Sequence, residues 1–192
     1  MSSGGFHVHG PHDHELEHAA QHEPKGFAGQ LAVITAILAT VGAVFAYMGG
    51  ATQAQAGLLK NDAAIKKTEA ANKWNHFQSK SSKQNLAELA LELVTTEDQR
   101  AKYRDKIARY EKEKNDIKTE AEALEAESKH LDDESAEQMH LHHRWAQATT
   151  ALQVSIAVAA IALLTKRRWM EWATLAFGGV GIALGIVAWL HH

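Results

Sequence analysis

The histidines near the N-terminus have the types and spacing of a metal site. The segment HELEH at residues 14–18 places two imidazoles four residues apart, and His22 follows after four more. On a helix such residues share one face and can reach one Zn²⁺, while a neighbouring glutamate polarises a metal-bound water. The sequence therefore predicts a candidate Zn²⁺, Ni²⁺ or Cu²⁺ site at His14, His18 and His22.

The surroundings of this motif do not suit catalysis. The same pattern is the H-E-x-x-H signature of zinc proteases, in which the helix is buried and a separate element supplies a third ligand. Residues 1–27 contain few large apolar residues, and Pro11 and Pro24 lie close to the motif. We therefore expect a disordered His-rich tail at 1–27, with modest metal affinity as the alternative, and no enzyme activity.

A second group of imidazoles, His140, His142 and His143, precedes Arg144 and Trp145. Because tryptophan is enriched at membrane interfaces, we interpret this group as an interfacial belt with Trp145 at the level of the headgroups. The alternative is a metal-binding or pH-sensing collar that forms when several chains assemble.

Three apolar blocks set the fold class. Residues 28–50, 146–165 and 169–190 each have the length of a helix that crosses a bilayer core of about 30 Å, and Glu171 is the one charged residue in them. The net charge of -3 gives no reason to expect nucleic acid, and the absence of cysteine excludes disulfides. The sequence thus predicts an all-α membrane protein with three transmembrane helices.

The region 51–145 between the first two blocks is rich in Ala, Glu and Lys and favours long helices. Thr96 and Gln99 have the spacing of a capping box, which predicts a turn near 95–96. We therefore expect an antiparallel helical hairpin, forming a coiled-coil stalk. Folding the chain at this turn pairs residues whose numbers add up to about 191, and the same pairing sets the first apolar block against the second.

Heptad-like spacing defines the expected seam of this stalk. After the turn it follows Tyr103, Ile107, Tyr110, Ile117, Ala121, Leu124 and Leu131, with Lys114 and Ser128 at the skipped positions. Before the turn it follows Ala63, Ala70, Trp74 and Phe77, loses register across 80–84 and resumes on Leu86, Leu89 and Leu93.

Two features predict self-association or a partner in a membrane complex. The seam contains little apolar area for a two-helix hairpin. In the last block, Gly178, Gly181 and Gly185 form a flat face that suits close helix contact. The alternative for these glycines is packing within the chain, against the block that carries Gly42 and Gly49.

The short basic loop at 166–168 predicts the orientation of the chain. Positive charge in short loops favours the cytoplasmic side, so we expect this loop and the N-terminus in the cytoplasm and the stalk on the other side, which is the periplasm in a bacterium. Lys60, Lys66 and Lys67 beyond the first block favour the reverse.

Residues 72–84 (NKWNHFQSKSSKQ) resemble the W-x-x-[YF]-Q-x-K-S-x-[KR]-Q signature of a bacterial membrane family, domain-of-unknown-function 4337. The resemblance extends over 27–190, from one span through a charged helical stretch to two spans joined by a short loop. It implies an inner-membrane protein and supplies no activity. It points to Trp74, Phe77, Gln78, Lys80 and Lys83 as candidates for a specific contact surface, with local packing of Trp74 and Phe77 as the alternative.

Together these features predict a non-enzymatic inner-membrane structural or interaction protein that self-associates or serves as an accessory subunit. Its expected partners are the lipid bilayer and either further copies of the same chain, in a homo-oligomer, or another protein of a membrane complex. No cofactor and no small-molecule substrate is indicated apart from the possible metal at the tail. The alternatives are a metal-responsive membrane protein that uses the His-rich tail, and a channel or transporter component. The latter is disfavoured because the polar residues of the spans are mainly Thr, Ser and Gln.

Overall fold

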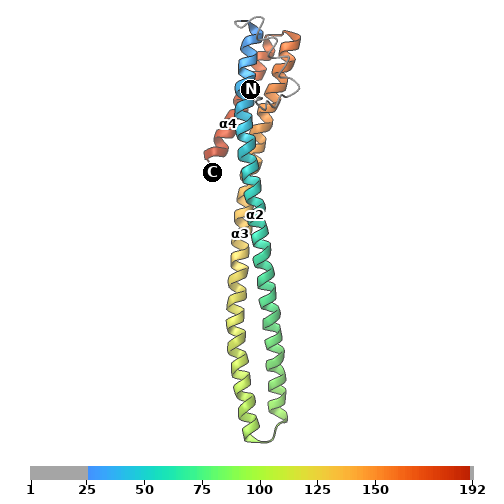
Figure 1. Ribbon diagram of the computed structural model, residues 1–192, viewed down its shortest axis with the longest axis vertical. Helices are drawn as coiled ribbons and strands as arrows, with labels where there is room; N and C mark the ends of the chain where they lie inside the picture. Colours follow the sequence, from blue (N-terminus) through green and yellow to red (C-terminus); the bar gives the residue numbers. More distant parts are fainter. Residues whose placement is uncertain (1–25, 191–192) are drawn as a thin grey trace, which may run out of the picture. The chain divides into compact units, whose positions relative to one another are not determined.

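The computed structural model describes residues 26–190, which fold into three long helices without strands (Figure 1). They are α2 (Phe27–Leu93), α3 (Glu97–Thr165) and α4 (Trp169–Leu190). Each contains a segment long and apolar enough to cross a membrane. The predicted all-α class with three membrane-length helices is therefore confirmed at this level.

The break between α2 and α3 covers residues 94–96, where the capping-box pattern places the turn. The Thr96 hydroxyl donates a hydrogen bond to the side-chain carbonyl of Gln99 at 2.9 Å, and the Arg100 N–H donates to the Thr96 carbonyl at 3.0 Å. Glu97 and Asp98 occupy the first turn of α3, where negative charge complements the helix dipole.

The break between α3 and α4 covers the basic residues 166–168. Lys166 has φ 52°, the left-handed conformation in which many helices end. The Arg167 carbonyl then accepts a hydrogen bond from the Met170 N–H at 3.1 Å, which starts the first turn of α4.

The described residues belong to two compact units. The hairpin unit comprises residues 54–137, that is, the last part of α2 and the first part of α3. The apolar unit comprises the rest of α2 and α3 together with α4, and each unit is described separately below.

In the hairpin unit, α2 and α3 lie side by side and antiparallel (Figure 1). The Ser128 hydroxyl donates to the Ala63 carbonyl at 2.8 Å, and the Ser135 hydroxyl donates to the Ala56 carbonyl at 2.8 Å. In both pairs the residue numbers add up to 191, the value that the sequence predicts. On α3 the skipped position Ser128 is buried and Lys114 is half-buried, so both belong to the seam.

The predicted loss of register on α2 is wrong. Lys80 and Gln84 are half-buried and continue the seam, whereas Leu86, Leu89 and Leu93 are exposed by 66%, 54% and 73%. The buried and half-buried positions alternate in steps of three and four along Ala56, Leu59, Ala63, Lys66, Ala70, Lys73, Phe77, Lys80, Gln84, Ala87, Leu91 and Val94. Polar residues keep the seam in register because they have partners on α3.

In the apolar unit, three helices pack around short side chains. The buried face of α3 comprises Ala148, Leu152, Ser155, Ala159 and Ala162, again in steps of four and three. Leu31 of α2 packs with Ala159 and Ala162. Many large apolar side chains point outward from the same unit, among them Val33, Val44, Ile161, Val180 and Ile186.

Candidate interaction surfaces

Two aromatic residues of the signature segment pack within the hairpin unit. Trp74 is half-buried, and its indole Nε1–H donates to the Glu125 carboxylate at 2.8 Å. The Trp74 and Phe77 rings meet edge to face, with centroids 5.6 Å apart. Lys114 Nζ of α3 lies 5.4 Å from the centre of the Phe77 ring. Both rings therefore contact α3, which favours the local-packing alternative for them.

The polar residues Lys80 and Gln84 also contact α3. The Lys80 ammonium forms an ion pair with Glu113 at 2.6 Å and lies 5.7 Å from the centre of the Tyr110 ring. The Gln84 side-chain carbonyl accepts a hydrogen bond from Lys114 Nζ at 3.1 Å. A polar seam position is thus stable here because each charge has a partner.

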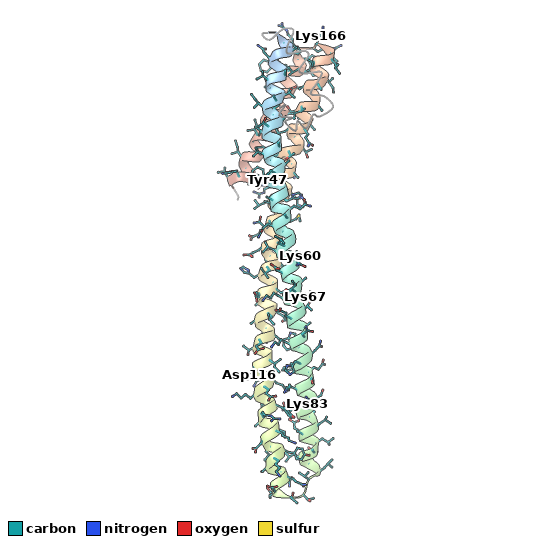
Figure 2. The ribbon with its side chains drawn as sticks, in the orientation of Figure 1. Tyr47, Lys60, Lys67, Lys83, Asp116 and Lys166 are labelled. Atoms are coloured by element: carbon teal, nitrogen blue, oxygen red, sulfur yellow. The ribbon has the colours of Figure 1, made fainter. Side chains whose placement is uncertain are left out.

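Gln78 and Lys83 differ from the rest of the signature. Both are exposed, and neither side chain has a hydrogen bond or ion pair with another described residue. Figure 2 labels Lys83 on α2 of the hairpin unit. Of the five predicted contact residues, Trp74, Phe77 and Lys80 therefore pack within the unit, and Gln78 and Lys83 remain accessible to a partner.

A ladder of ion pairs joins α2 to α3. Lys66 pairs with Glu127 at 3.2 Å, Lys73 pairs with Glu120, and Lys80 pairs with Glu113. The steps are seven residues on both helices, and the residue numbers of each pair add up to 193. The predicted seam does not include this ladder, although the matching seven-residue repeats of Lys before the turn and Glu after it are visible in the sequence.

The ladder shifts the titration of two of its members. The hydrogen bond and the charge of Glu127 hold the pKa of Lys66 above its usual value of 10.5. The hydrogen bond from Lys80 is the main reason why the pKa of Glu113 lies below its usual value of 4.5. Both shifts favour the charged forms and hence the paired state near neutral pH.

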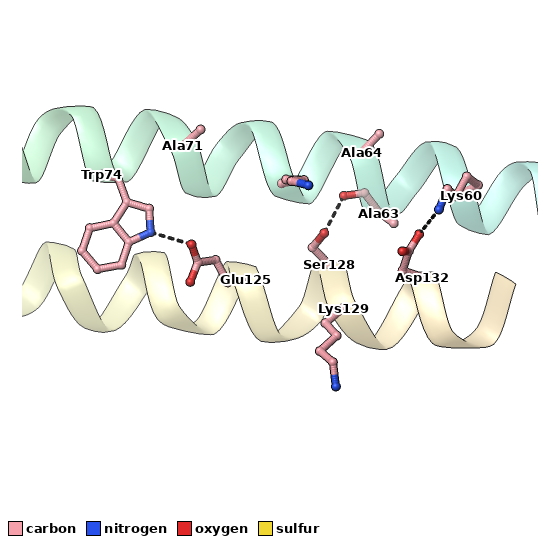
Figure 3. Close-up of a pocket in the computed structure, with 10 residues that line it drawn as sticks. Lys60, Ala63, Ala64, Ala71, Trp74, Glu125, Ser128, Lys129 and Asp132 are labelled. Atoms are coloured by element: carbon pink, nitrogen blue, oxygen red, sulfur yellow. Dashed lines mark hydrogen bonds and ion pairs between the residues drawn. The ribbon is translucent and has the colours of Figure 1, made fainter. Parts of the chain in front are cut away.

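A groove of about 610 Å³ runs along the hairpin unit where its facing side chains are short (Figure 3). Ala63, Ala64 and Ala71 contribute to its lining. The Trp74–Glu125 hydrogen bond and the Lys60–Asp132 ion pair of 2.5 Å flank it. Since both carboxylates are engaged by α2, the groove offers a shallow apolar surface with lysine at its rim rather than a reactive centre.

The three leucines Leu86, Leu89 and Leu93 form a second apolar surface, here named the leucine face. Steps of three and four place them on one side of α2, and all three are exposed. No other described residue covers them. Large apolar side chains grouped in this way are typical of an interaction surface.

The glycines of α4 make close contacts within the apolar unit. A Cβ on Gly178 would lie 3.0 Å from Leu38 of α2, and one on Gly181 would lie 2.7 Å from Leu152 of α3. Gly185 lies against the Phe45 ring. All three glycines are buried, so the close helix contact predicted for Gly178, Gly181 and Gly185 occurs between helices of one chain, as in the intramolecular alternative.

Trp145 does not have the place expected of an interfacial anchor. Only 1% of the residue is exposed, and its ring packs on Phe45 with centroids 5.3 Å apart. The absence of a side chain on Gly49 makes room for it, since a Cβ there would lie 3.3 Å from that of Trp145. His142 Nδ1 donates to the Gly49 carbonyl at 2.8 Å. The belt interpretation is therefore wrong for Trp145, which is a packing residue.

The predicted metal ligands His14, His18 and His22 lie outside the described residues. Among residues 26–190, no group of three or more His, Cys, Asp or Glu side chains is arranged to hold a metal ion. The pair His142 and His143, with ring centroids 5.6 Å apart, lacks a third ligand in this part of the chain.

Comparison with known proteins adds a family and no activity. No curated protein and no solved structure matches the chain. A family model described as a domain of unknown function, DUF4337, matches residues 27–191, which include all three helices and both units. The chain therefore belongs to the DUF4337 family, as the signature at 72–84 indicates.

Proposed function

We propose that this protein is a non-enzymatic integral membrane protein of the bacterial inner membrane that acts as a structural or interaction module. The apolar unit anchors it, and the hairpin unit forms a coiled-coil stalk that contacts other proteins. In this role it self-associates or serves as an accessory subunit of a membrane complex.

The outward-facing surface of the apolar unit supports the membrane location. Val33, Val44, Val180 and Ile186 are each more than half exposed, which is unfavourable in water and favourable in lipid. Tyr47, Trp169, Trp172 and Trp189 are exposed as well, and such residues prefer the edges of a bilayer.

The basic connection between α3 and α4 supports the orientation. Lys166, Arg167 and Arg168 are all exposed in a loop of three residues, to which the positive-inside rule applies strongly. We place this loop and the N-terminus in the cytoplasm and the hairpin unit in the periplasm.

The leucine face is the observation that carries the interaction role. The seam of the hairpin unit is already filled by alanines, serines and the lysine–glutamate ladder, whereas Leu86, Leu89 and Leu93 remain exposed. An exposed apolar stripe at seam-like spacing is the surface that a further helix would cover.

Native mass spectrometry of the full chain in lipid nanodiscs tests this proposal. We expect a complex heavier than one chain, and its loss in a variant with Leu86, Leu89 and Leu93 replaced by Gln. A control with Gln at the exposed Ala123 and Ala126 keeps the complex. A wild-type chain that remains single and unaccompanied would contradict the interaction role.

A further inference from the structure

The amide of Gln153 lies exposed on an apolar surface of the apolar unit. Gln153 of α3 is exposed, and its side chain has no hydrogen-bond partner among the described residues. Hydroxyls on the same helix are satisfied locally, since Thr150 donates to the Ala146 carbonyl at 2.8 Å and Thr165 donates to the Ile161 carbonyl at 2.8 Å. The Gln153 amide has two N–H donors and a carbonyl acceptor, and none of them has a hydrogen-bond partner of this kind on its own helix.

The depth of Gln153 makes this exposure costly. It follows Ala146 by seven residues and precedes Thr165 by twelve, so it lies about 10 Å and about 18 Å from the two ends of this apolar block. If the block crosses a bilayer, as the proposed function requires, the amide faces hydrocarbon and not water. A polar group in that place is stable when it finds a partner on another helix.

The residues around Gln153 allow another helix to approach. Ala146, Thr150, Gln153 and Ala157 follow one another in steps of four, three and four, so they share one side of α3. The main contacts of α2 and α4 are on a different side of α3, which includes Leu152, Ser155 and Ala159. Phe177 and Val180 of α4 border the proposed face at its Ala146 and Thr150 end, where they line a groove with these two residues. Apart from the glutamine, the exposed side has short side chains at these positions, and short side chains permit close helix contact.

The chemistry of the amide selects a second copy of the chain as the partner. Copies inserted in the same orientation carry Gln153 at the same depth, and a two-fold axis along the membrane normal brings the two amides together. Each amide then donates to the other and accepts from it. We propose that the α3 face of Ala146, Thr150, Gln153 and Ala157 joins two copies of this chain through a Gln153–Gln153 hydrogen-bonded pair.

Energy transfer between labelled full-length chains in liposomes tests this contact. The chain has no cysteine, so one dye can be placed at a cysteine replacing the exposed Ser79. Interhelical hydrogen bonds in membranes contribute enough to change an association constant about tenfold, and we expect Gln153→Leu to weaken the association by about this factor. The control Gln147→Leu, on another side of α3, leaves it within about twofold, and Gln153→Asn retains most of it.

Single-cysteine cross-linking provides a second measurement that does not remove the amide. A cysteine at Ala157 is expected to form a disulfide between copies under mild oxidation, whereas a cysteine at Val33, exposed on α2, does not. Cross-linking at Val33 in place of Ala157, or wild-type association in Gln153→Leu, would overturn the proposed contact. Carbonate extraction separates the two proposals, because release of the chain from membranes refutes the membrane location, whereas a retained chain that associates equally well without Gln153 refutes this contact alone.

Discussion

The helices of the two units pack against one another through different types of residue. In the apolar unit, helices approach through Gly178, Gly181 and Gly185, against which Leu38, Leu152 and Phe45 pack. In the hairpin unit, alanines and serines fill the seam and lysine–glutamate pairs join its flanks. Both units keep alternating steps of three and four residues.

The proposed membrane location explains this difference, because it gives the two units different solvents. In lipid, burial of apolar side chains gives little driving force, so close backbone contact and dispersion hold the helices together. In water, apolar burial and charge pairing are both available, and polar seam positions are tolerated when each has a partner. The same heptad-like spacing therefore carries glycine in one unit and lysine in the other.

The largest effect is expected from adding volume to the glycine contact. Gly181→Leu places a side chain where Leu152 already lies, and overpacking of this kind destabilises by about 2–3 kcal/mol. Gly179→Leu is the matched control, because a Cβ on Gly179 meets nothing within 4 Å. Thermal unfolding in detergent measures the difference, and equal melting temperatures for both variants would show that α4 is not held by this contact.

A smaller effect is expected from the same test in the hairpin unit. Ala121 is fully buried in the seam, and Ala121→Leu forces α2 and α3 apart at a cost of about 1–2 kcal/mol. The neighbouring Ala123 is exposed, so Ala123→Leu should be nearly neutral. Hydrogen exchange of residues 54–137 in the full chain reports the loss, and unchanged protection in Ala121→Leu would contradict the assigned seam.

Charge reversal in the ladder should give a still smaller, recoverable effect. Lys73→Glu sets two carboxylates against each other at Glu120 and should cost about 0.5 kcal/mol, as expected for a partly exposed pair. The double variant Lys73→Glu/Glu120→Lys restores opposite charges and most of the hydrogen-exchange protection. A double variant no better than the single one would mean that the two side chains do not interact.

The pH dependence of the hairpin unit should be the weakest effect. Because the folded-state pKa of Glu113 is lowered from 4.5, its contribution is complete above that pH and is lost as the pH falls through the lowered value. Lys66 has a raised pKa, so its contribution is complete below pH 10.5 and is lost above it. Hydrogen exchange of the wild type and Glu113→Gln between pH 3 and 7 measures the acidic limb, which Glu113→Gln should make shallower.

Much of the fold follows from local sequence signals. The turn at 94–96 lies at the capping-box residues, and the pairing number of 191 is met by Ser128 with Ala63 and by Ser135 with Ala56. These features are predictable because a helix cap and a heptad-like spacing are properties of short segments.

The errors come from partners far away in sequence. By hydrophobicity alone, leucine is expected in the seam rather than lysine or glutamine. Lys80 and Gln84 nevertheless occupy the seam, because they have partners opposite them on α3, namely Glu113 and Lys114. Trp145 at the start of an apolar block suggests an interface until Phe45 and Gly49 are seen to enclose it. In both cases the deciding residue lies on another helix.

The most direct test of the account is whether the two units contact different solvents. Nitroxide labels at Val44 and Val180 of the apolar unit, and at Ser79 and Ala123 of the hairpin unit, are all on exposed positions. In liposomes, we predict that oxygen relaxes the labels of the apolar unit strongly and that a water-soluble nickel complex does not. The labels of the hairpin unit should be relaxed strongly by the nickel complex and weakly by oxygen. Strong relaxation of the Val44 and Val180 labels by the nickel complex would contradict the membrane assignment.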